Sequence, residues 1–246
     1  MSHLSRGIFK TLPIAIWDYF AWMIKYSSKK RQKYAIDKRY RRLQKLIKKV
    51  SDNFEITYHI EGKENLPDGP LAFFPNHSAG FDPIAFIYNL DKPTAFVAKK
   101  EIKKWPAVNR CVKVIDGEFM DRDDLKQSLK VMMRVEKSLK QGNMNWIIFP
   151  EGTRNKDPLT NLRDFHHGSF RPAVKAGVPI VPVAIYGTYR ILSNKYKKYP
   201  VYIKFLKPLM PEDYQNMSTQ EIAQYAHDEV QKALSFDLLI KDHKFH

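Results

Sequence analysis

Two short segments of the sequence carry residue types that could transfer a proton. In NHSAGFD, His77 is followed five positions later by Asp82, and FPEGTR holds Glu151 and Arg154. A neutral imidazole acts as a general base near neutral pH, especially when a carboxylate holds its other ring nitrogen and stabilises the imidazolium. No Ser or Cys nucleophile in a strand-turn-helix setting accompanies the pair. The sequence therefore indicates a base that acts directly on a substrate hydroxyl.

Both segments also have a purely structural interpretation. A His and an Asp at this spacing can belong to an ordinary turn, and Glu151 with Arg154 can form an ion pair on a surface turn. However, both segments follow apolar, strand-like runs, and ligands of open α/β sheets bind beyond the carboxyl ends of the strands. The planar donor fork of an Arg at such a position matches phosphate oxygens. The two segments together therefore indicate one shared site.

The elements that must position these residues follow an alternating pattern. Short β-rich runs predict strands within residues 54–62, 69–74, 93–99, 112–120, 143–149, 179–187 and 201–209. Helical spacing and capping residues predict helices at 82–90, 121–142, 168–177 and 218–234. Strands that alternate with helices predict an α/β domain with a mostly parallel central sheet flanked by helices.

The 246-residue chain has a net charge of +16, and much of this excess lies near the N-terminus. Residues 25–49 contain twelve Lys or Arg and one Asp, a net charge of +11. Such an arm favours polyanions, either nucleic acid or an anionic membrane surface. The composition changes near residue 50, which predicts an N-terminal region over 1–50 and a catalytic domain over 51–246.

The apolar and aromatic run at residues 12–24 favours the membrane over nucleic acid. It contains Asp18, lacks a signal-peptide cleavage site and is shorter than the ~20 apolar residues that span a bilayer. Aromatic side chains beside a polybasic run are typical of amphipathic, membrane-interfacial helices, expected here over 8–24 and 29–50. The alternative is a solvated basic helix. The residues that we expect at the membrane are Trp17, Phe20, Trp22, Lys29, Lys30 and Arg31.

The other reactive side chains predict no second site. Cys111 is the only cysteine, which excludes an intramolecular disulfide and fits a reducing compartment. It lies in an apparent strand start, so we expect a buried structural thiol. His166 and His167 are adjacent and point in different directions on any regular element, and no third residue has zinc-site spacing. We therefore expect neither a metal nor a cofactor.

The two segments resemble the His-x4-Asp and Glu-Gly-Thr-Arg blocks of the glycerolipid acyltransferases. GEFMDR at 117–122 resembles the family's block with a hydrophobic residue, Asp and Arg, and VPIVPVAI at 178–185 resembles its proline-containing block. VAKKEI at 97–102 is similar to the family's Ala-Lys-x-Glu-Leu segment. The resemblance covers about residues 54–205. In length and layout it is closest to the bacterial 1-acyl-sn-glycerol-3-phosphate acyltransferases.

This resemblance implies a glycerolphosphate-acyltransferase-like fold and a role in phospholipid biosynthesis. The enzyme would transfer an acyl chain from acyl-CoA or acyl carrier protein to the sn-2 hydroxyl of lysophosphatidic acid, giving phosphatidic acid. His77 would be the general base and Asp82 would orient it. The residues implied for binding the acceptor phosphate are Lys99, Arg122, Glu151, Gly152, Thr153 and Arg154. Those implied behind the site or along the acyl path are Val178, Pro179 and Pro182.

The resemblance also implies a peripheral or monotopic enzyme of the cell membrane, with its site facing the cytoplasm and anionic lipids as partners. The chain has Ala79 where the family often has Ser, and Val108-Asn109 where a Gly commonly follows the proline. An acyltransferase for another lysolipid or an amine-bearing lipid is therefore an alternative. A nucleic-acid-binding protein would leave the strand-end residues without a purpose, so we expect no nucleic-acid partner. A scaffold with an inactive acyltransferase fold is disfavoured by the intact His77 and Asp82.

Overall fold

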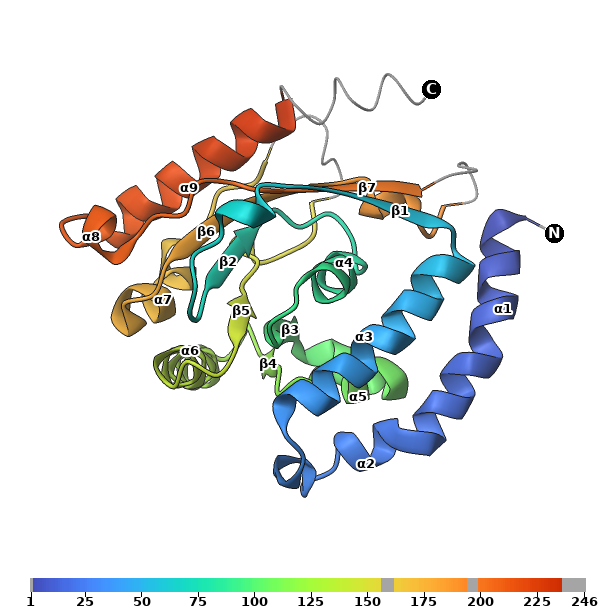
Figure 1. The fold of residues 1–246 in the computed structure, drawn as a ribbon. Coiled ribbons are helices and arrows are strands. Elements are labelled where there is room, and N and C mark those ends of the chain that lie inside the picture. The colour runs from blue at the N-terminus through green and yellow to red at the C-terminus, as the bar shows by residue number, and fades with distance from the viewer. Residues whose placement is uncertain (1, 156–161, 194–198, 236–246) are drawn as a thin grey trace.

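The structure is a computed structural model that describes residues 2–155, 162–193 and 199–235 (Figure 1). Its helices are α1 (His3–Asp18), α2 (Ile24–Tyr26), α3 (Ile36–Asn53), α4 (Asp82–Asn89), α5 (Pro106–Val114), α6 (Leu125–Lys140), α7 (Arg171–Ala176), α8 (Pro211–Tyr214) and α9 (Thr219–Ala233). Its strands are β1 (Ile56–Glu61), β2 (Ala72–Pro75), β3 (Thr94–Lys99), β4 (Glu118–Met120), β5 (Asn145–Ile147), β6 (Ile180–Tyr186) and β7 (Tyr199–Phe205). A π-helical turn at Tyr19–Met23 joins α1 to α2.

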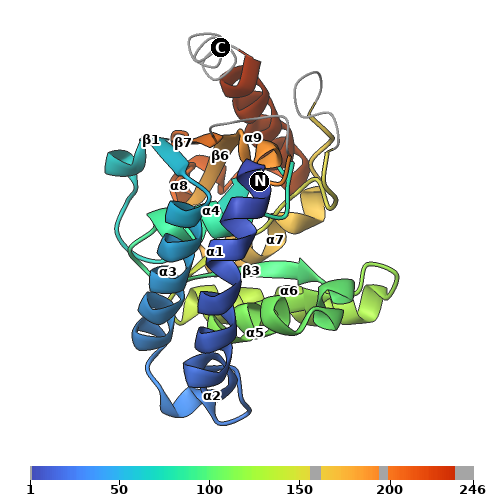
Figure 2. The same cartoon turned by 90° about the vertical axis from the view of Figure 1, so that its right-hand side faces the viewer.

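The strands form one sheet in the order β1-β7-β6-β2-β5-β3-β4. All neighbours pair in parallel except β6 and β7, so the predicted mostly parallel sheet is confirmed. β2 is central, and its Ala72 lies in register with Trp146 on one side and Ile180 on the other. The carboxyl ends of β6, β2, β5, β3 and β4 therefore share one edge, toward which β3 points in Figure 2. This edge is where an α/β sheet places its ligand site.

Helices cover both faces of the sheet, and each face has its own apolar core (Figure 1). Phe73 packs with α3, α4 and α5, whereas the next residue, Phe74, packs with α6, α7 and α9. This alternation follows from the period of two along a strand. Phe73 and Phe74 are both fully buried. A shift of β2 by one residue would therefore move each ring into the core on the opposite face of the sheet. The central strand therefore enters the carboxyl edge at a fixed position.

The N-terminal helices pack onto this domain. α1 lies along α3 (Figures 1 and 2), and α3 buries Tyr40, Leu43 and Ile47 in the same core as the sheet. The buried Arg39 donates to Asp116 at 2.6 Å, and Arg31 donates to the other oxygen of that carboxylate at 2.7 Å. These ion pairs tie the basic arm to the loop before β4. The boundary at residue 50 stays a prediction.

Two expectations about local structure were wrong. The helix expected over 29–50 begins at Ile36 instead, because residues 28–34 form turns and a short 3-10 helix (Arg31–Lys33), from which Arg31 reaches across to Asp116. Residues 112–115, read as part of a strand with Cys111, belong to α5 and the turn after it, because Pro106 at the first turn starts a helix there. The Cys111 thiol is partly buried, and desolvation raises its pKa to about 12, so it is inert.

The spacing of apolar residues predicts the helix α6 but not the face that it buries. The helix begins at Leu125 rather than at 121, because the side chain of Asp124 caps it by accepting from the backbone N–H of Gln127, and it ends just before Gly142, as predicted. However, Leu125 and Leu129 are exposed, and the buried stripe is made by Val131, Val135 and Leu139. Spacing identified the helix but not which of its apolar positions face the sheet.

Candidate active site

The site begins where β2 leaves the sheet. Asn76 is buried, and its side chain bonds both the N–H and the C=O of Ile185 on β6, at 2.8 and 3.0 Å. Its amide thus replaces the backbone pairing that the two strands lose at this point. This contact fixes the direction in which the chain turns into His77.

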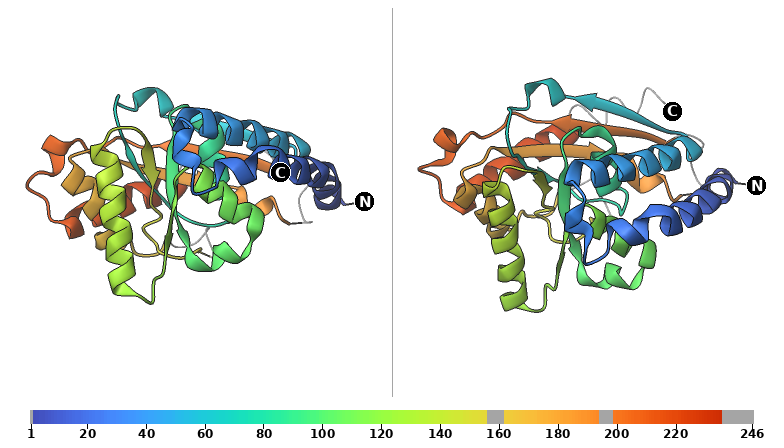
Figure 3. Two further views of the ribbon diagram at one scale, coloured as in Figure 1. Left: turned by 90° about the horizontal axis from the view of Figure 1, so that it is seen from below. Right: turned by 60° about the horizontal axis from the view of Figure 1, so that its bottom comes forward.

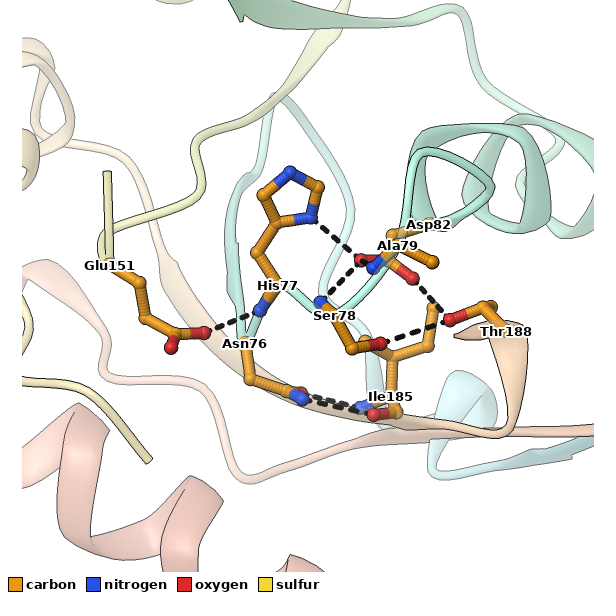
Figure 4. Close-up of polar contacts among 8 residues, drawn as sticks. All are labelled: Asn76, His77, Ser78, Ala79, Asp82, Glu151, Ile185 and Thr188. Atoms are coloured by element: carbon orange, nitrogen blue, oxygen red, sulfur yellow. Dashed lines mark hydrogen bonds and ion pairs between the residues drawn. The ribbon is translucent and has the colours of Figure 1, made fainter. Parts of the chain in front are cut away.

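His77 and Asp82 lie in direct contact. The ring Nδ1 is 2.7 Å from Asp82 Oδ2, although the two residues are separated by a turn (Figure 4). The buried carboxylate can only accept, so the neutral ring carries its proton on Nδ1 and leaves the Nε2 lone pair free. In Figure 4, Nε2 points away from Asp82. Among the described residues, no hydrogen-bond partner of Nε2 is present. The arrangement is that of a general base held by a carboxylate.

Asp82 is itself held on both oxygens. Oδ2 also accepts from the backbone N–H groups of Ser78 and Ala79, at 2.8 and 2.9 Å, and Oδ1 accepts from the hydroxyl of Thr188. The residue is fully buried at the start of α4, where the helix dipole favours a negative charge. The carboxylate is therefore fixed in both position and orientation before any substrate binds.

Thr188 was missed by the sequence reasoning. It follows Gly187 at the end of β6, and its buried side chain also lies 3.1 Å from the Ser78 hydroxyl. Gly187 has φ +94°, and an added Cβ would stand 2.2 Å from the Pro200 carbonyl oxygen, so this sharp turn requires glycine. The available signal was the one used elsewhere: a polar residue directly after an apolar strand. β6 lies beside β2, which brings Thr188 to Asp82.

Glu151 supports the same turn from the other side. Its Oε1 accepts the backbone N–H of His77 at 2.5 Å, and its Oε2 accepts that of Arg163 at 3.3 Å. Burial raises the pKa of Glu151 to about 7, although these two N–H bonds oppose the shift. The resemblance placed Glu151 at the acceptor phosphate, but the structure turns its carboxylate toward the backbone of the His77 turn. A buried carboxylate there positions the base.

The ring of Phe149 forms one wall of this region, with its centroid 4.1 Å from that of His77. The next residues pass into an open turn. Gly152 has φ +68°, and an added Cβ would meet the His166 ring at 3.0 Å, so this position also favours glycine. His166 therefore packs against the turn. Among the described residues, no group of three His, Cys, Asp or Glu could hold a metal ion.

The sequence-predicted cations lie around the base without touching it. Arg154 is exposed and lines a small cavity of about 200 Å³ together with Ser78, Thr188 and Leu192. Lys99 ends β3, and Arg122 follows β4, in which Met120 is in register with Lys99. These residues therefore share the carboxyl edge with His77, one and two strands beyond β5. Thr153 is exposed beside Arg154.

The comparisons with known proteins agree with this geometry. The sequence model of the Acyltransferase family matches residues 57–186, more than half of the chain, and this range contains both His77-Asp82 and Glu151-Arg154. The chain belongs to the Acyltransferase family.

Individual relatives are more specific. A 1-acyl-sn-glycerol-3-phosphate acyltransferase of Haemophilus influenzae is 27% identical over 164 residues, covering 66% of this chain and 68% of that protein. One from Borreliella burgdorferi is 34% identical over 130 residues, covering 52% of this chain and 51% of that protein. The crystal structure of the 1-acyl-sn-glycerophosphate (LPA) acyltransferase PlsC from Thermotoga maritima superimposes with a TM-score of 0.73. It is 26% identical, and the match covers 94% of this chain and 96% of that one.

The residues expected along the acyl path of this acyltransferase are all buried. Val178 packs in the core under α7 and α9, and its carbonyl accepts from the Tyr214 hydroxyl at 3.0 Å. Pro179 is buried before β6, and Pro182 lies within β6 in register with Phe74. Val178 and Pro179 lie at the start of β6, where the Pro179 carbonyl accepts from the N–H of Ala72, so they are at the opposite edge of the sheet from His77. A role along the acyl path stays a prediction.

The residues expected at the membrane divide into two groups. Trp17 and Phe20 are exposed, and together with Phe9, Leu12 and Ile16 they give α1 and the π-helical turn after it a broad apolar outer face. Lys29 and Lys30 are exposed as well. Trp22 differs from its expected position: it is buried, and its indole N–H donates to Asp18 at 2.7 Å. Arg31 is engaged with Asp116. None of the described helices combines the length and apolar composition needed to cross a membrane.

Proposed function

We propose that the protein is a 1-acyl-sn-glycerol-3-phosphate O-acyltransferase. It transfers an acyl chain from a thioester to the sn-2 hydroxyl of lysophosphatidic acid and releases phosphatidic acid. The single observation that carries the reaction type is the His77–Asp82 contact of 2.7 Å at the carboxyl edge of the sheet. The identity of the acceptor is inferred from the names of the relatives.

His77 Nε2 takes the proton of the acceptor hydroxyl while the hydroxyl oxygen attacks the thioester carbonyl. The new C–O bond forms, the tetrahedral intermediate collapses with cleavage of the C–S bond, and the imidazolium returns its proton to the thiolate. Asp82 stabilises the imidazolium during this sequence. No covalent enzyme intermediate is needed, because the Ser78 hydroxyl is engaged with Thr188 and the Cys111 thiol is inert.

The acceptor's phosphate binds to the cations of the same edge. Arg154 borders the cavity beside Ser78 and is the principal contact, because a guanidinium matches phosphate oxygens with two parallel hydrogen bonds. Arg122 and Lys99 act from β4 and β3. Lys99 has a competing partner, since its Nζ lies 3.4 Å from Glu101. A phosphate must displace that contact, so Lys99 contributes less than Arg154.

The enzyme works at a membrane surface, on the proposed assignment, because its acceptor and product are amphiphiles. The exposed apolar face of α1 inserts among the headgroups, and the exposed lysines after it contact anionic lipid. The proposal places the enzyme on the membrane as a peripheral or monotopic protein, with the site facing the cytoplasm. Both acyl-CoA and acyl carrier protein stay open as donors, since the two are anionic.

The test is a product assay with the purified full-length protein. It receives lysophosphatidic acid with either labelled acyl-CoA or labelled acyl carrier protein, and the product is identified by mass. Phosphatidic acid from at least one donor is expected, formed about a hundredfold or more slowly by a His77→Ala preparation. Its absence with both donors would remove the assignment. Other lysolipids tested in parallel decide the acceptor, and binding to anionic vesicles against duplex DNA tests the nucleic-acid alternative.

A further inference from the structure

A second exposed apolar surface lies on the segment that leaves β3. Trp105 is 65% exposed and Val108 is 37% exposed, although both belong to an ordered stretch. The backbone N–H of Trp105 donates to Ile102 at 3.0 Å, and its carbonyl accepts from Asn109 at 2.8 Å. The indole is therefore displayed by a fixed turn at the start of α5. We call residues 99–108 the Trp105 surface.

This surface lies next to the N-terminal helices. The Arg110 guanidinium on α5 stacks over the Tyr19 ring at 4.9 Å and donates to the Ser27 hydroxyl at 2.9 Å. α5 thus packs directly against the π-helical turn that joins α1 to α2. In Figure 2, α5 lies below β3 and beside the lower part of α1. The Trp105 surface therefore connects the apolar face of α1 with the opening of the site.

The composition of the surface matches an anionic lipid headgroup layer. Lys99, Lys103 and Lys104 are exposed around Trp105, against one acidic residue, Glu101. Trp is the residue type that favours the interface between water and lipid, and each nearby cation strengthens attraction to an anionic surface. A protein partner of acidic surface would satisfy the lysines. Continuity with the apolar face of α1 favours the lipid.

We propose that the Trp105 surface is a second lipid contact, separate from α1, that holds the carboxyl edge of the sheet against the headgroups. This inference rests on the proposed function, since it assumes an enzyme that works on membrane lipids. α1 alone would attach the molecule along one side and leave the site free to tilt away from the lipid. The second contact fixes that tilt, so that Lys99 and Arg122 face the layer that contains the acceptor phosphate.

The four tryptophans of the chain allow a direct test. Trp17 and Trp105 are 72% and 65% exposed, whereas Trp22 and Trp146 are 4% and 2% exposed. The full-length Trp17→Phe protein is mixed with vesicles of phosphatidylglycerol and acyl-chain-brominated phosphatidylcholine, which quench only tryptophans that reach the lipid. The double variant Trp17→Phe/Trp105→Phe measures the quenching of the two buried residues. Both substitutions are at exposed sites, so the fold should be preserved, which circular dichroism checks.

Quenching in Trp17→Phe that is lost in the double variant is the expected result. Equal quenching in the two proteins would overturn the proposal, because Trp105 would then not reach the lipid. The single variant Trp105→Phe separates this failure from failure of the membrane assignment. If its Trp17 is still quenched, only the second contact is wrong. If neither exposed tryptophan is quenched, the membrane assignment fails as well.

Vesicle sedimentation gives an independent readout with a matched control. Leu129 is 50% exposed on α6, which lies across the sheet from α1 and α5 (Figures 1 and 3). Trp105→Ser should weaken binding to anionic vesicles severalfold, whereas Leu129→Ser should leave it unchanged. Equal losses in the two variants would mean that any exposed apolar residue contributes, and the Trp105 surface would have no special role.

Discussion

The His77 turn and the basic rim of the same edge are built in opposite ways. In the turn, Asp82 receives donors on both oxygens, Glu151 accepts the backbone N–H of His77, and the Asn76 side chain bonds the backbone of Ile185 on β6. On the rim, Lys99, Arg122 and Arg154 are exposed at the ends of different strands. The base is therefore preorganised by buried contacts, whereas the cations are positioned individually by the loops that carry them.

This difference has an energetic basis. A buried polar network raises the local strength of each hydrogen bond and makes any unmade bond costly, so it defines one geometry. Long exposed cations lose side-chain entropy when they are held in place, and water screens their interactions. Chemistry needs the fixed geometry, and recognition of a mobile amphiphile tolerates the adaptable one. Variants in the turn should therefore alter kcat, and variants on the rim should alter the acceptor KM.

The largest effect is expected for His77→Ala. Loss of a general base costs about 10² to 10⁴ in rate, and no other imidazole contacts the same turn among the described residues. Both kcat and kcat/KM should fall, while the thermal unfolding midpoint stays close to that of the parent protein. Turnover above about a tenth of the parent's would mean that His77 is not the base.

Arg154→Ala should produce the largest effect on the rim. A charge-assisted hydrogen bond is worth about 1.5 to 3 kcal/mol, which corresponds to a tenfold to hundredfold rise in the acceptor KM. The donor KM and kcat should change little. Lys99→Ala is the matched comparison, with a smaller rise because Glu101 competes for its ammonium. If Arg154→Ala raised the KM of the acceptor and of the donor equally, this would contradict the assignment of acceptor binding to the basic rim.

Thr188→Val removes one donor from Asp82 while keeping the side-chain volume. We expect kcat to fall about tenfold with the acceptor KM unchanged, because a hydrogen bond to a charged group is worth about 1.5 to 3 kcal/mol and part of it is lost in the transition state. Thr188→Ser keeps the hydroxyl and should retain most of the rate. If Thr188→Val kept the parent rate while Thr188→Ser were slow, Thr188 would act only through its methyl group and not as a positioning residue.

The contacts of the site that could be predicted from the sequence join residues that are close together in the chain or that lie at the ends of adjacent strands. His77 and Asp82 are five residues apart, so a single turn brings them together, and the FPEGTR segment reaches the same edge through an adjacent parallel strand. Thr188 was missed because its partner lies 106 positions earlier in the chain. The contact depends on β6 lying beside β2 in the sheet, and this strand order cannot be predicted from any single segment of the sequence.

Burial was the second property that the sequence could not assign. Trp17 and Trp22 belong to one aromatic run, yet Trp17 is exposed and Trp22 is buried. The π-helical turn at Tyr19–Met23 rotates the chain between them, and Trp22 bonds Asp18 below the surface. Composition correctly predicted an apolar, aromatic, helical segment. Which aromatic faces outward depends on the contact with α3 and α5.

The smallest effect on the rate is expected at Glu151, where the change should appear in stability instead. Burial raises the pKa of Glu151 from 4.5 to about 7, so the folded state binds this proton more tightly than the unfolded state does. Its contribution is complete below about pH 4.5 and is lost as the pH rises to 7. A shift of this size corresponds to roughly 3 kcal/mol.

Glu151→Gln removes this titration while one amide oxygen can still accept from the His77 N–H. The free energy of unfolding of the parent protein should therefore fall between pH 4.5 and 7 more steeply than that of the variant, as measured by urea denaturation at several pH values. At pH 7.5 the rates of the two proteins should agree within a few-fold, because the amide keeps the turn in place. Parallel stability curves between pH 4.5 and 7 would show that the pKa of Glu151 is not raised and that the His77 N–H bonds a carboxylate over this range. A hundredfold loss of rate in the variant would instead place the Glu151 charge in the chemistry, and the turn would then be more than a fixed support for His77.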